Sequence, residues 1–352
     1  MEVLVINPGS TSTKIAIYQD ENPIYTESIN HTPADLAPFP RVLDQLEYRL
    51  KMIRAALDKA GFPLSELEAV SARGGFTKPV VAGTYRVDED VVEEMRYHAR
   101  KEHAANLGSL LAWELTKDTD IPAFFVDPVS VDELPDVARV TGFAGMERGS
   151  FVHALNHRST ARKAAAQLGK TYPECNFVVA HLGGGVTTAA HRKGRMVEIN
   201  NVFDEGCFSM DRGGSLPVQQ VIDFCFSGLS KTEVLRRLET CSGVVSYLGT
   251  RDFRDVERMA FDEGNEKAKL VFDAMVYQLS RDIASMSAVL KFDVDAIVLT
   301  GGMAYSKRLC AAVEDYVKKI APILILPGEN EMLSLAQGAL RVLRGEEQAR
   351  KF

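Results

Sequence analysis

Two segments of this chain share one arrangement, in which an apolar run enters a turn of small residues and a second apolar run leaves it. The first, VLVINPGSTSTKIAIY, spans residues 3–18. Val3–Ile6 and Ile15–Tyr18 are short apolar runs without helical periodicity, which predicts strands on either side of a Pro-Gly turn. The second segment, Phe177 to Ala190, repeats the arrangement around glycines 183–185. Because each segment opens one half of the chain, the pattern predicts an internal duplication.

Helical periodicity fills most of the sequence between the strands. Apolar residues at helical spacing predict helices over residues 41–60, 93–115, 156–168, 268–290 and 332–343, and further strands are predicted over 196–199 and 296–299. The alternation of strands and helices predicts an α/β fold in two lobes. No linker rich in proline and serine separates the halves, so we expect them to pack closely across a cleft.

The polar turns suit anionic ligands. Ser10, Ser12 and Lys14 alternate along the first turn, so they should share one face, and Gly9 lets backbone N–H groups approach a ligand. Hydroxyls and one cation suit a phosphate chain, although an ordinary hairpin with a polar tip explains the same residues. The strand that ends at Thr300-Gly301-Gly302 precedes a helix start at Lys307, whose free N–H groups could bind a phosphate or nucleoside. The chain lacks GxxxxGK[ST], so it is not a P-loop NTPase. It also lacks GxGxxG after a strand, which counts against a dinucleotide dehydrogenase.

Composition narrows the class of protein. A chain of 352 residues predicts two domains at about 150 residues each. Its 46% hydrophobic and 25% charged content is typical of a globular enzyme, and a net charge of -7 argues against nucleic-acid binding. The five cysteines form no CxxC pair, which signals neither zinc nor a disulfide framework. With no signal peptide or spanning apolar stretch visible, we expect no membrane partner and a cytoplasmic location.

Nine motifs carry a family resemblance. They include INPGSTSTK, FVDPVSVDELP, FVHALNH, VVAHLGGG, FDEGCFSMDRGGSLP, TRDFRD and LTGGMAYSKRL, in this order and spread over nearly the whole chain. This order resembles the acetokinase family of acetate and butyrate kinases, within the actin, hexokinase and Hsp70 superfamily. The short length and the FDEGCFSMDRGGSLP stretch look more like the butyrate and branched-chain fatty acid kinases than acetate kinase.

The resemblance implies the fold and the reaction. It implies two ribonuclease H-like, actin-like ATPase domains, residues 1–127 with 333–352 and residues 128–332, and an active-site cleft between them. It implies reversible phosphoryl transfer from ATP to butanoate, giving ADP and butanoyl phosphate, with Mg²⁺ as the metal. A branched-chain fatty acid, propionate or acetate kinase is the alternative enzyme. A homodimer or a higher homo-oligomer is also expected.

The resemblance also implies residue roles. The catalytic residues would be Arg73 for the carboxylate, Asp127, and His153 with Arg212 for the transferring phosphoryl group. The nucleotide would be held by Asn7, Ser10, Ser12, Lys14, His181, Gly183, Gly184, Gly185, Asp252, Phe253, Arg254, Gly301, Gly302, Met303, Ala304 and Tyr305. Asn7 and Glu331 would bind the metal, with Glu329 as the alternative to Glu331.

The chemistry of the reaction agrees with these residue types. Donor and acceptor are both anionic, so their approach needs cations, and Arg73 and Arg212 offer planar forks for carboxylate and phosphoryl oxygens. A carboxylate is already ionised near neutral pH, so Asp127 need not remove a proton and is better suited to organising metal, water or arginines. His153 and His157 are four residues apart and could form a metal pair, but no third ligand is spaced nearby. An actin-like or Hsp70-like ATPase module is the alternative of another class, and it needs no carboxylate-binding arginine.

Overall fold

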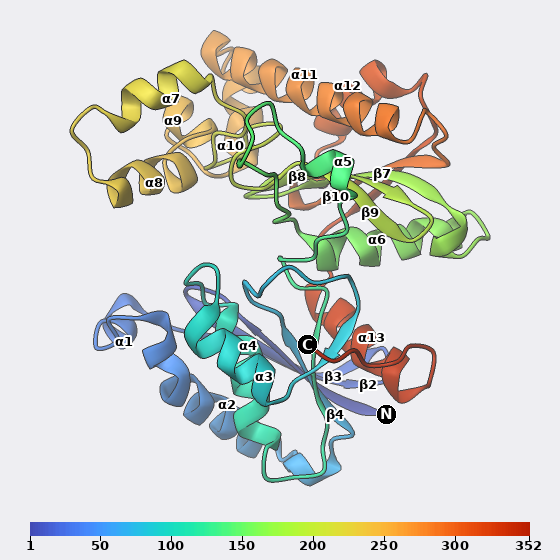
Figure 1. The fold of residues 1–352 in the computed structure, drawn as a ribbon. Coiled ribbons are helices and arrows are strands. Elements are labelled where there is room, and N and C mark those ends of the chain that lie inside the picture. The colour runs from blue at the N-terminus through green and yellow to red at the C-terminus, as the bar shows by residue number, and fades with distance from the viewer. The chain divides into compact units, whose positions relative to one another are not determined.

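The computed structural model describes all residues, 1–352, and divides the chain into two compact units. Unit 1 comprises Met1–Asp132 and Asn330–Phe352, and unit 2 comprises Glu133–Glu329. Each unit contains one β-sheet with helices on both faces, as Figure 1 shows. The family resemblance predicts these boundaries after residue 127 and before residue 333.

Unit 1 contains a six-stranded sheet of order β3-β2-β1-β4-β6-β5. The strands are β1 (Glu2–Pro8), β2 (Ser12–Gln19), β3 (Asn22–Asn30), β4 (Ala69–Arg73), β5 (Thr84–Arg86) and β6 (Ala123–Val126). Strands β1, β2 and β3 form an antiparallel meander, β4 and β6 continue parallel to β1, and β5 is antiparallel to β6. The carboxyl ends of the three parallel strands therefore lie at one edge of the sheet.

Helices cover both faces of this sheet. They are α1 (Pro33–Leu36), α2 (Leu46–Ala60), α3 (Glu89–Glu93), α4 (Asn106–Thr116) and α13 (Glu331–Leu343). Residues of α2 and α4 form one core with alternate residues of the strands, including Val70 and Ala72. Ser71, which points to the other face, donates its hydroxyl to the carbonyl of Leu335 in α13 at 2.7 Å. The final helix of the chain thus completes the unit in which the chain begins.

Unit 2 contains a five-stranded sheet of order β11-β10-β7-β8-β9. The strands are β7 (Asn176–Leu182), β8 (Val186–Arg192), β9 (Arg195–Ile199), β10 (Ala296–Gly301) and β11 (Ile323–Pro327). Again, the first three strands form an antiparallel meander and the next two continue parallel to the first. This repeated order agrees with the internal duplication that the two turn segments predicted.

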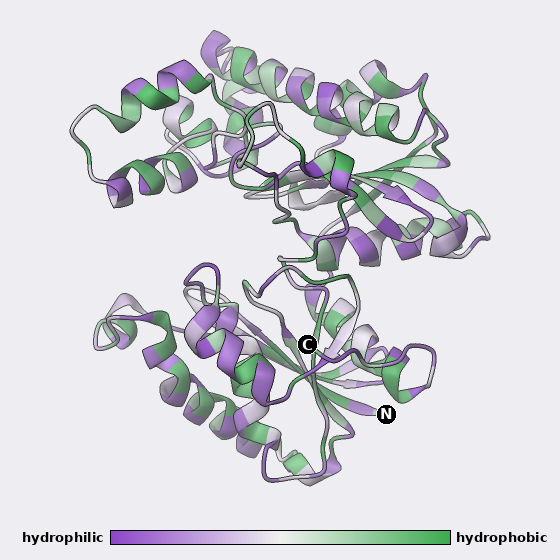
Figure 2. Ribbon diagram, in the orientation of Figure 1, coloured by the Kyte–Doolittle hydropathy of each residue, from purple (hydrophilic) through white to green (hydrophobic).

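Helices of unit 2 lie on both faces of its sheet. They are α5 (Asp136–Arg139), α6 (Ala154–Gln167), α7 (Val218–Cys225), α8 (Lys231–Thr240), α9 (Val244–Leu248), α10 (Phe253–Glu257), α11 (Glu266–Val289) and α12 (Lys307–Val317). Helices α11 and α12 share a core with one face of the sheet, and α6 packs its alanines on the other face. Figure 2 shows apolar and polar residues alternating along α11, as expected of a helix with one buried face.

One predicted helix was wrong. Residues 93–115 do not form one helix, because a π-helical turn, Glu94–His98, ends at Ala99 and α4 begins only at Asn106. The intervening segment pairs elsewhere: Arg100 donates its backbone N–H to Phe76, and the Asn106 side chain accepts from Phe76 and donates to Lys101. The long-range pairing with residue 76 has no signature in the local apolar spacing. No helix of the structure has the length and apolar character needed to span a bilayer.

Candidate active site

In unit 1, three predicted site residues lie at the carboxyl ends of the parallel strands. Asn7 lies near the end of β1, Arg73 ends β4, and Asp127 comes directly after β6. The register pairs Ile6 with Ala72 and Arg73 with Val126, so the three residues lie side by side at the carboxyl edge of the sheet. Gly108 lets α4 pack here, because a Cβ on it would lie 2.2 Å from the carbonyl oxygen of Arg73.

Arg73, Asn7 and Glu331 form one polar cluster. Arg73 Nη1 lies 3.1 Å from each carboxylate oxygen of Glu331 and 3.4 Å from Asn7 Oδ1. Asn7 Nδ2 donates to Glu331 Oε2 at 2.8 Å. Glu331 opens α13, where a carboxylate is favoured by the helix dipole. The side chains of Arg73 and Glu331 remain 32% and 22% exposed, so a ligand can reach them.

Asp127 is held in a restricted conformation. Its φ of 38° lies in the left-handed region that few residues other than glycine adopt. Its Oδ1 accepts the backbone N–H of Gly83 at 2.7 Å, and its own N–H donates to the Gly83 carbonyl. The residue is almost completely buried. A carboxylate fixed by its neighbours in this way keeps one orientation, and its role in organising metal, water or arginines stays a prediction.

The first turn is supported by an arginine that the sequence analysis missed. Arg49 of α2 is completely buried and forms no ion pair. Its guanidinium donates to the carbonyls of Gly9, Ser10 and Ser12 and to the Thr13 hydroxyl, at 2.9, 3.4, 3.3 and 2.9 Å. Burial lowers the pKa of Arg49 from its ordinary value. The carbonyls of the turn point inward and accept hydrogen bonds from Arg49. The outer side of the turn is therefore left for other contacts. A buried cation also lies beneath it.

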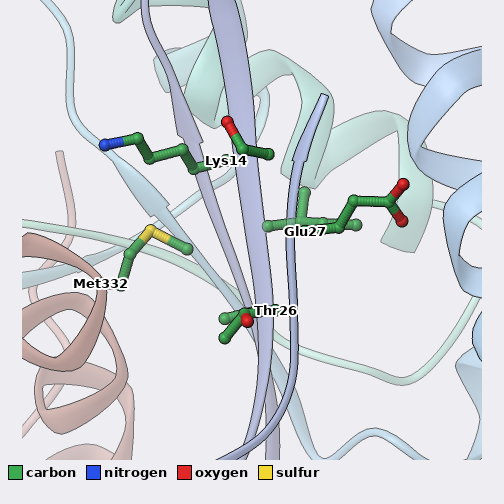
Figure 3. Close-up of a pocket in the computed structure, with 7 residues that line it drawn as sticks. Lys14, Thr26, Glu27 and Met332 are labelled. Carbon is green, nitrogen blue, oxygen red and sulfur yellow. The ribbon is translucent and has the colours of Figure 1, made fainter. Parts of the chain in front are cut away.

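Lys14 is exposed and has no ion-pair or hydrogen-bond partner in the chain. It lines a cavity of about 190 Å³ with Thr26, Ser28 and Met332, among others. Figure 3 shows Lys14 and Glu27 pointing in opposite directions from neighbouring strands. Along β2, Thr13 is buried between the partly exposed Ser12 and the exposed Lys14, and residues 15–18 are buried on both faces of the sheet. Ser10 is exposed and Ser12 is partly exposed, as a ligand-binding turn requires.

In unit 2, the glycine turn makes room for two charged groups. A Cβ on Gly185 would lie 2.5 Å from Arg212 Nη1, and one on Gly183 would lie 3.0 Å from both Glu329 Oε1 and His181 Nε2. Gly184 is exposed. Burial lowers the pKa of Arg212, and its Nε is buried without a hydrogen-bond partner. A buried guanidinium nitrogen without an acceptor is costly, which indicates that an anion completes this site.

The histidines of unit 2 extend the same site. His153 precedes α6, and its ring stacks on that of His181 at 4.1 Å between centroids. His181 Nδ1 lies 2.8 Å from Asn156 Oδ1, and its Nε2 lies 3.3 Å from Glu329 Oε1. An amide oxygen only accepts, so Nδ1 of His181 is the donor in this contact. Asn156, which the sequence analysis did not select, therefore fixes the ring of His181.

His157 and His191 lie behind His153 and are completely buried. Burial lowers the pKa of His157 far below its ordinary value and that of His191 to about 3, so both rings are neutral. His157 bonds the Thr187 hydroxyl, as His153 does, and no metal-binding group of three or more side chains occurs in the structure.

The residues expected around adenosine fall into two groups. Asp252 caps α10 and pairs with Arg254, and both are accessible. Phe253 is instead buried in the core against Phe272, as are Met303 and Ala304. Gly302 and Tyr305 are exposed, and Gly301 has φ 89° with its Cβ position 2.4 Å from the Leu182 carbonyl oxygen. Only glycine fits at position 301.

Comparison with known proteins defines the class. The model of the acetokinase family matches residues 144–333. Butyrate kinase 1 of Clostridium acetobutylicum is 44% identical to the chain, over 99% of both chains. Among solved structures, acetate kinase from Porphyromonas gingivalis superposes with a TM-score of 0.79 at 19% identity, covering 97% of this chain and 99% of its own. A propionate kinase from Francisella tularensis gives 0.78 at 18% identity, covering 96% of this chain and 98% of its own.

The chain therefore has the two-domain fold of the acetate kinases, a mixed α/β architecture with one sheet in each domain. It belongs to the acetokinase family, whose members are phosphotransferases with a carboxyl group as acceptor. Both the predicted fold class and the predicted family are confirmed.

Proposed function

We propose that this chain is a butyrate kinase that transfers the γ-phosphoryl group of ATP directly to butanoate and runs reversibly. The observation that carries the proposal is the buried Arg212 Nε without a partner beside Gly185, which calls for an anion. The 44% identity to a butyrate kinase over 99% of the chain supports butanoate as the acceptor. Branched-chain, propionate and acetate substrates are the alternatives within the class.

The roles follow from charge. Arg73 binds the carboxylate of the acceptor, which its partial exposure allows. A carboxylate oxygen attacks the γ-phosphorus, forming the new P–O bond as the bond to the bridging oxygen of ADP breaks. No proton is transferred, because the acceptor is already ionised. Arg212 and His153 stabilise the equatorial oxygens, and Asp127 organises the groups around it.

The remaining predicted residues serve the nucleotide. Ser10, Ser12 and Lys14 of unit 1 suit the terminal phosphates, and so do the glycines of residues 183–185 of unit 2. Asp252, Arg254, Gly302 and Tyr305 are accessible and suit the adenosine, whereas Phe253, Met303 and Ala304 support that surface from the core.

Mg²⁺ fits the donor chemistry at Asn7 and Glu331. Their amide and carboxylate oxygens lie in one cluster and are hard ligands, and Mg²⁺ takes few protein carboxylates. Glu329 instead lies beside His181, so Glu331 is the better-supported ligand. When bound, the metal neutralises phosphate charge. In the structure Arg73 contacts these same oxygens of Asn7 and Glu331. It would become available to the acceptor carboxylate when they bind the metal.

Two further expectations complete the proposal. We infer a homodimer, which the exposed apolar residues on and beside α7 support, with Val218 at 73% and Phe226 at 86% exposure. Light scattering of the purified protein tests it. A cytoplasmic location is also part of the proposal.

A coupled assay tests the acceptor. ADP release is measured with acetate, propionate, butanoate, isobutanoate and pentanoate at matched concentrations, and acyl phosphate is trapped as the hydroxamate. We expect the highest kcat/KM with butanoate. If kcat/KM is tenfold or more higher with a different carboxylate, that carboxylate replaces butanoate as the proposed substrate. ADP release at the same rate with and without each of the five carboxylates would contradict a carboxylate kinase.

A further inference from the structure

Gly83, the residue just before β5, bonds both the carboxylate and the backbone of Asp127. Its main-chain N–H donates to Asp127 Oδ1 at 2.7 Å, and its carbonyl accepts the N–H of Asp127 at 3.0 Å. In a continued antiparallel ladder the Gly83 N–H would donate to the Asp127 carbonyl. Asp127 has a positive φ, and its carboxylate takes the place of that carbonyl. The direction of both bonds is fixed, because each donor is a backbone N–H.

Gly83 depends on β5 for its place, and β5 is a short strand at the edge of the sheet. It has three residues and opposes Thr84 to Val126 of β6, so the next pair along the register is Gly83 and Asp127. Alternate residues of an antiparallel edge strand direct their main-chain groups away from the neighbouring strand. Gly83 therefore faces Asp127, whereas Thr84 and Arg86 face outward. Unless its outer edge is covered, such a strand frays easily and leaves Gly83 loosely held.

Residues 347–352 cover this outer edge of β5. Glu347 Oε1 accepts the main-chain N–H of Thr84 at 2.8 Å. The N–H of Arg350 donates to the Thr84 carbonyl at 2.8 Å, and the Arg350 carbonyl accepts the N–H of Arg86 at 3.0 Å. Both outward main-chain groups of Thr84 are thus bound by this segment, one residue away from the two bonds that hold Asp127.

Side chains of the same segment pack against the strand pair. The ring of Phe352 lies 6.4 Å from that of Tyr85 in β5 and 6.2 Å from that of Phe125 in β6, between centroids. The rings of Tyr85 and Phe125 are themselves stacked at 5.0 Å. The Arg350 side chain passes so close to Gly83 that a Cβ there would lie 2.5 Å from Arg350 Nε. The segment therefore contacts β5 through its backbone and through its side chains.

We propose that Glu347, Arg350 and Phe352 are positioning residues for Asp127. They hold β5 against β6, and β5 in turn presents the N–H of Gly83 to the Asp127 carboxylate. All of these residues belong to unit 1. The consequence for catalysis rests on the proposed function, in which Asp127 organises the groups around it. A carboxylate that loses its fixed donor samples other orientations, so kcat should fall while KM changes little.

The segment offers two matched sets of variants. Glu347→Ala removes the acceptor of the Thr84 N–H, whereas Glu347→Gln keeps an oxygen there. Glu346→Ala is the control, because Glu346 is exposed and its carboxylate forms no hydrogen bond or ion pair in the chain. Arg350→Pro removes the N–H that the Thr84 carbonyl accepts. Its control is Lys351→Pro, at an exposed residue whose N–H has no partner in the chain.

Amide hydrogen exchange of the full-length protein, followed by NMR at each residue, tests the positioning itself. Glu347→Ala and Arg350→Pro should each speed exchange at Gly83 about tenfold or more relative to the amides of β1. Glu347→Gln and the two controls should change it less than about twofold. Unchanged exchange at Gly83 in folded Glu347→Ala or Arg350→Pro would overturn the inference. So would equal acceleration throughout β1, or failure of both variants to fold, because the segment would then serve the stability of the whole unit.

Kinetics test the consequence. Glu347→Ala should lower kcat about tenfold and change KM for ATP and butanoate less than about twofold, and Glu347→Gln should restore most of kcat. In an Asp127→Asn background, Glu347→Ala should lower kcat no further, because both changes act on one carboxylate. Additive losses in the double variant, or wild-type kcat in a Glu347→Ala protein with fast exchange at Gly83, would contradict the catalytic part. If the enzyme phosphorylates no carboxylate but exchange at Gly83 responds as expected, the proposed function fails and the structural inference stands.

Discussion

The two units present different chemical groups to an anionic ligand. Unit 1 relies on formal charge: Arg73 pairs with Glu331, Lys14 has no partner, and Arg49 is a buried cation beneath the first turn. Unit 2 presents imidazoles in hydrogen-bonded contact with hydroxyl and amide groups, with Arg212 as the cation beside its glycine turn. The five strands of the unit 2 sheet follow the same order as β3-β2-β1-β4-β6 of unit 1, so the difference arises from side chains and not from the shared topology.

This difference has a physical cause. A charge near the surface can exchange a protein partner for a substrate at little cost, as the partly exposed Arg73 and Glu331 permit. A charge in the interior is expensive, so groups that must hold a fixed orientation there are neutral and fully hydrogen-bonded. Arg212 and Arg49 are two buried cations that depart from this expectation, since Arg212 lacks an acceptor at Nε and Arg49 binds only neutral acceptors.

The largest effect should come from the cation of unit 2. Arg212→Ala should lower kcat on the order of 10³-fold or more, because a charge partner of the transferring phosphoryl group is lost. Arg212→Lys should recover part of this loss, since it restores charge without the planar fork. Steady-state kinetics with saturating substrates check both variants. Wild-type turnover by Arg212→Ala would remove Arg212 from the mechanism.

Arg73→Ala is the corresponding change in unit 1. It should also lower kcat/KM for the carboxylate on the order of 10³-fold, while nucleotide binding survives. Glu331→Gln is the companion variant, because it keeps the contact with Asn7 but removes the negative charge. Isothermal titration with ATP separates the two functions: if Arg73→Ala abolishes ATP binding, the arginine serves the nucleotide and not the acceptor.

Arg49 tests whether the first turn depends on its buried cation. Arg49→Met should lower the free energy of unfolding by about 3 kcal/mol, because the carbonyls of Gly9, Ser10 and Ser12 lose their donor inside the protein. ATP binding should weaken together with stability. Denaturant unfolding and titration provide the measurements, and Lys51→Met on the exposed side of α2 is the control. Unchanged stability in Arg49→Met would show that the turn is held by its own backbone.

Lys14 should have a smaller and more selective effect. Lys14→Ala should weaken ATP about tenfold and AMP hardly at all, since its charge serves the terminal phosphates. It should also slow the reverse reaction from acyl phosphate and ADP. Calorimetric titrations with ATP, ADP and AMP check this. Equal weakening of all three would make the segment an ordinary hairpin with a polar tip.

Asp282 is a buried carboxyl group of unit 2 that tests the cost of charge in the interior. Burial raises its pKa to about 6, opposed by the Cys207 backbone N–H that it accepts at 2.6 Å. The folded-state pKa lies above the unfolded one, so its contribution to stability is present at low pH and is lost as pH rises from about 4 through about 6.

Asp282→Asn removes this loss while keeping an acceptor for Cys207. Its stability relative to the wild type should therefore rise by about 1 kcal/mol between pH 5 and pH 7.5. Denaturant unfolding at the two pH values checks the sign. A relative stability that falls over this interval would mean that the carboxylate is favoured in the folded protein.

The sequence was most informative where structure is local. The strands of residues 3–18 and 177–190 and the helix of residues 268–290 follow from apolar spacing and turn residues, and ordered motifs gave the family. The helix predicted over residues 93–115 failed because Asn106 and Arg100 bond to Phe76, far away in sequence. Local spacing holds no information about such a pairing.

The supporting residues of the site were missed for a similar reason. Arg49 looks like an ordinary polar position of an amphipathic helix, and only the packing of α2 on the sheet shows that it is completely buried. Thr187 gains its meaning from the register of β8 against α6, which brings its hydroxyl between two histidines. Residues that touch the substrate follow motifs, whereas residues that hold them depend on tertiary contacts.

The central claim is that this chain transfers the γ-phosphoryl group of ATP directly to a carboxylate. ³¹P NMR of the enzyme with ATP, Mg²⁺ and butanoate tests it most directly, because every phosphorus species is seen at once. The account predicts that an acyl phosphate signal and the ADP signals grow in equal amounts as ATP falls, and that both vanish without butanoate. Growth of inorganic phosphate with ADP, at a rate independent of butanoate, would instead identify an ATPase and contradict the account.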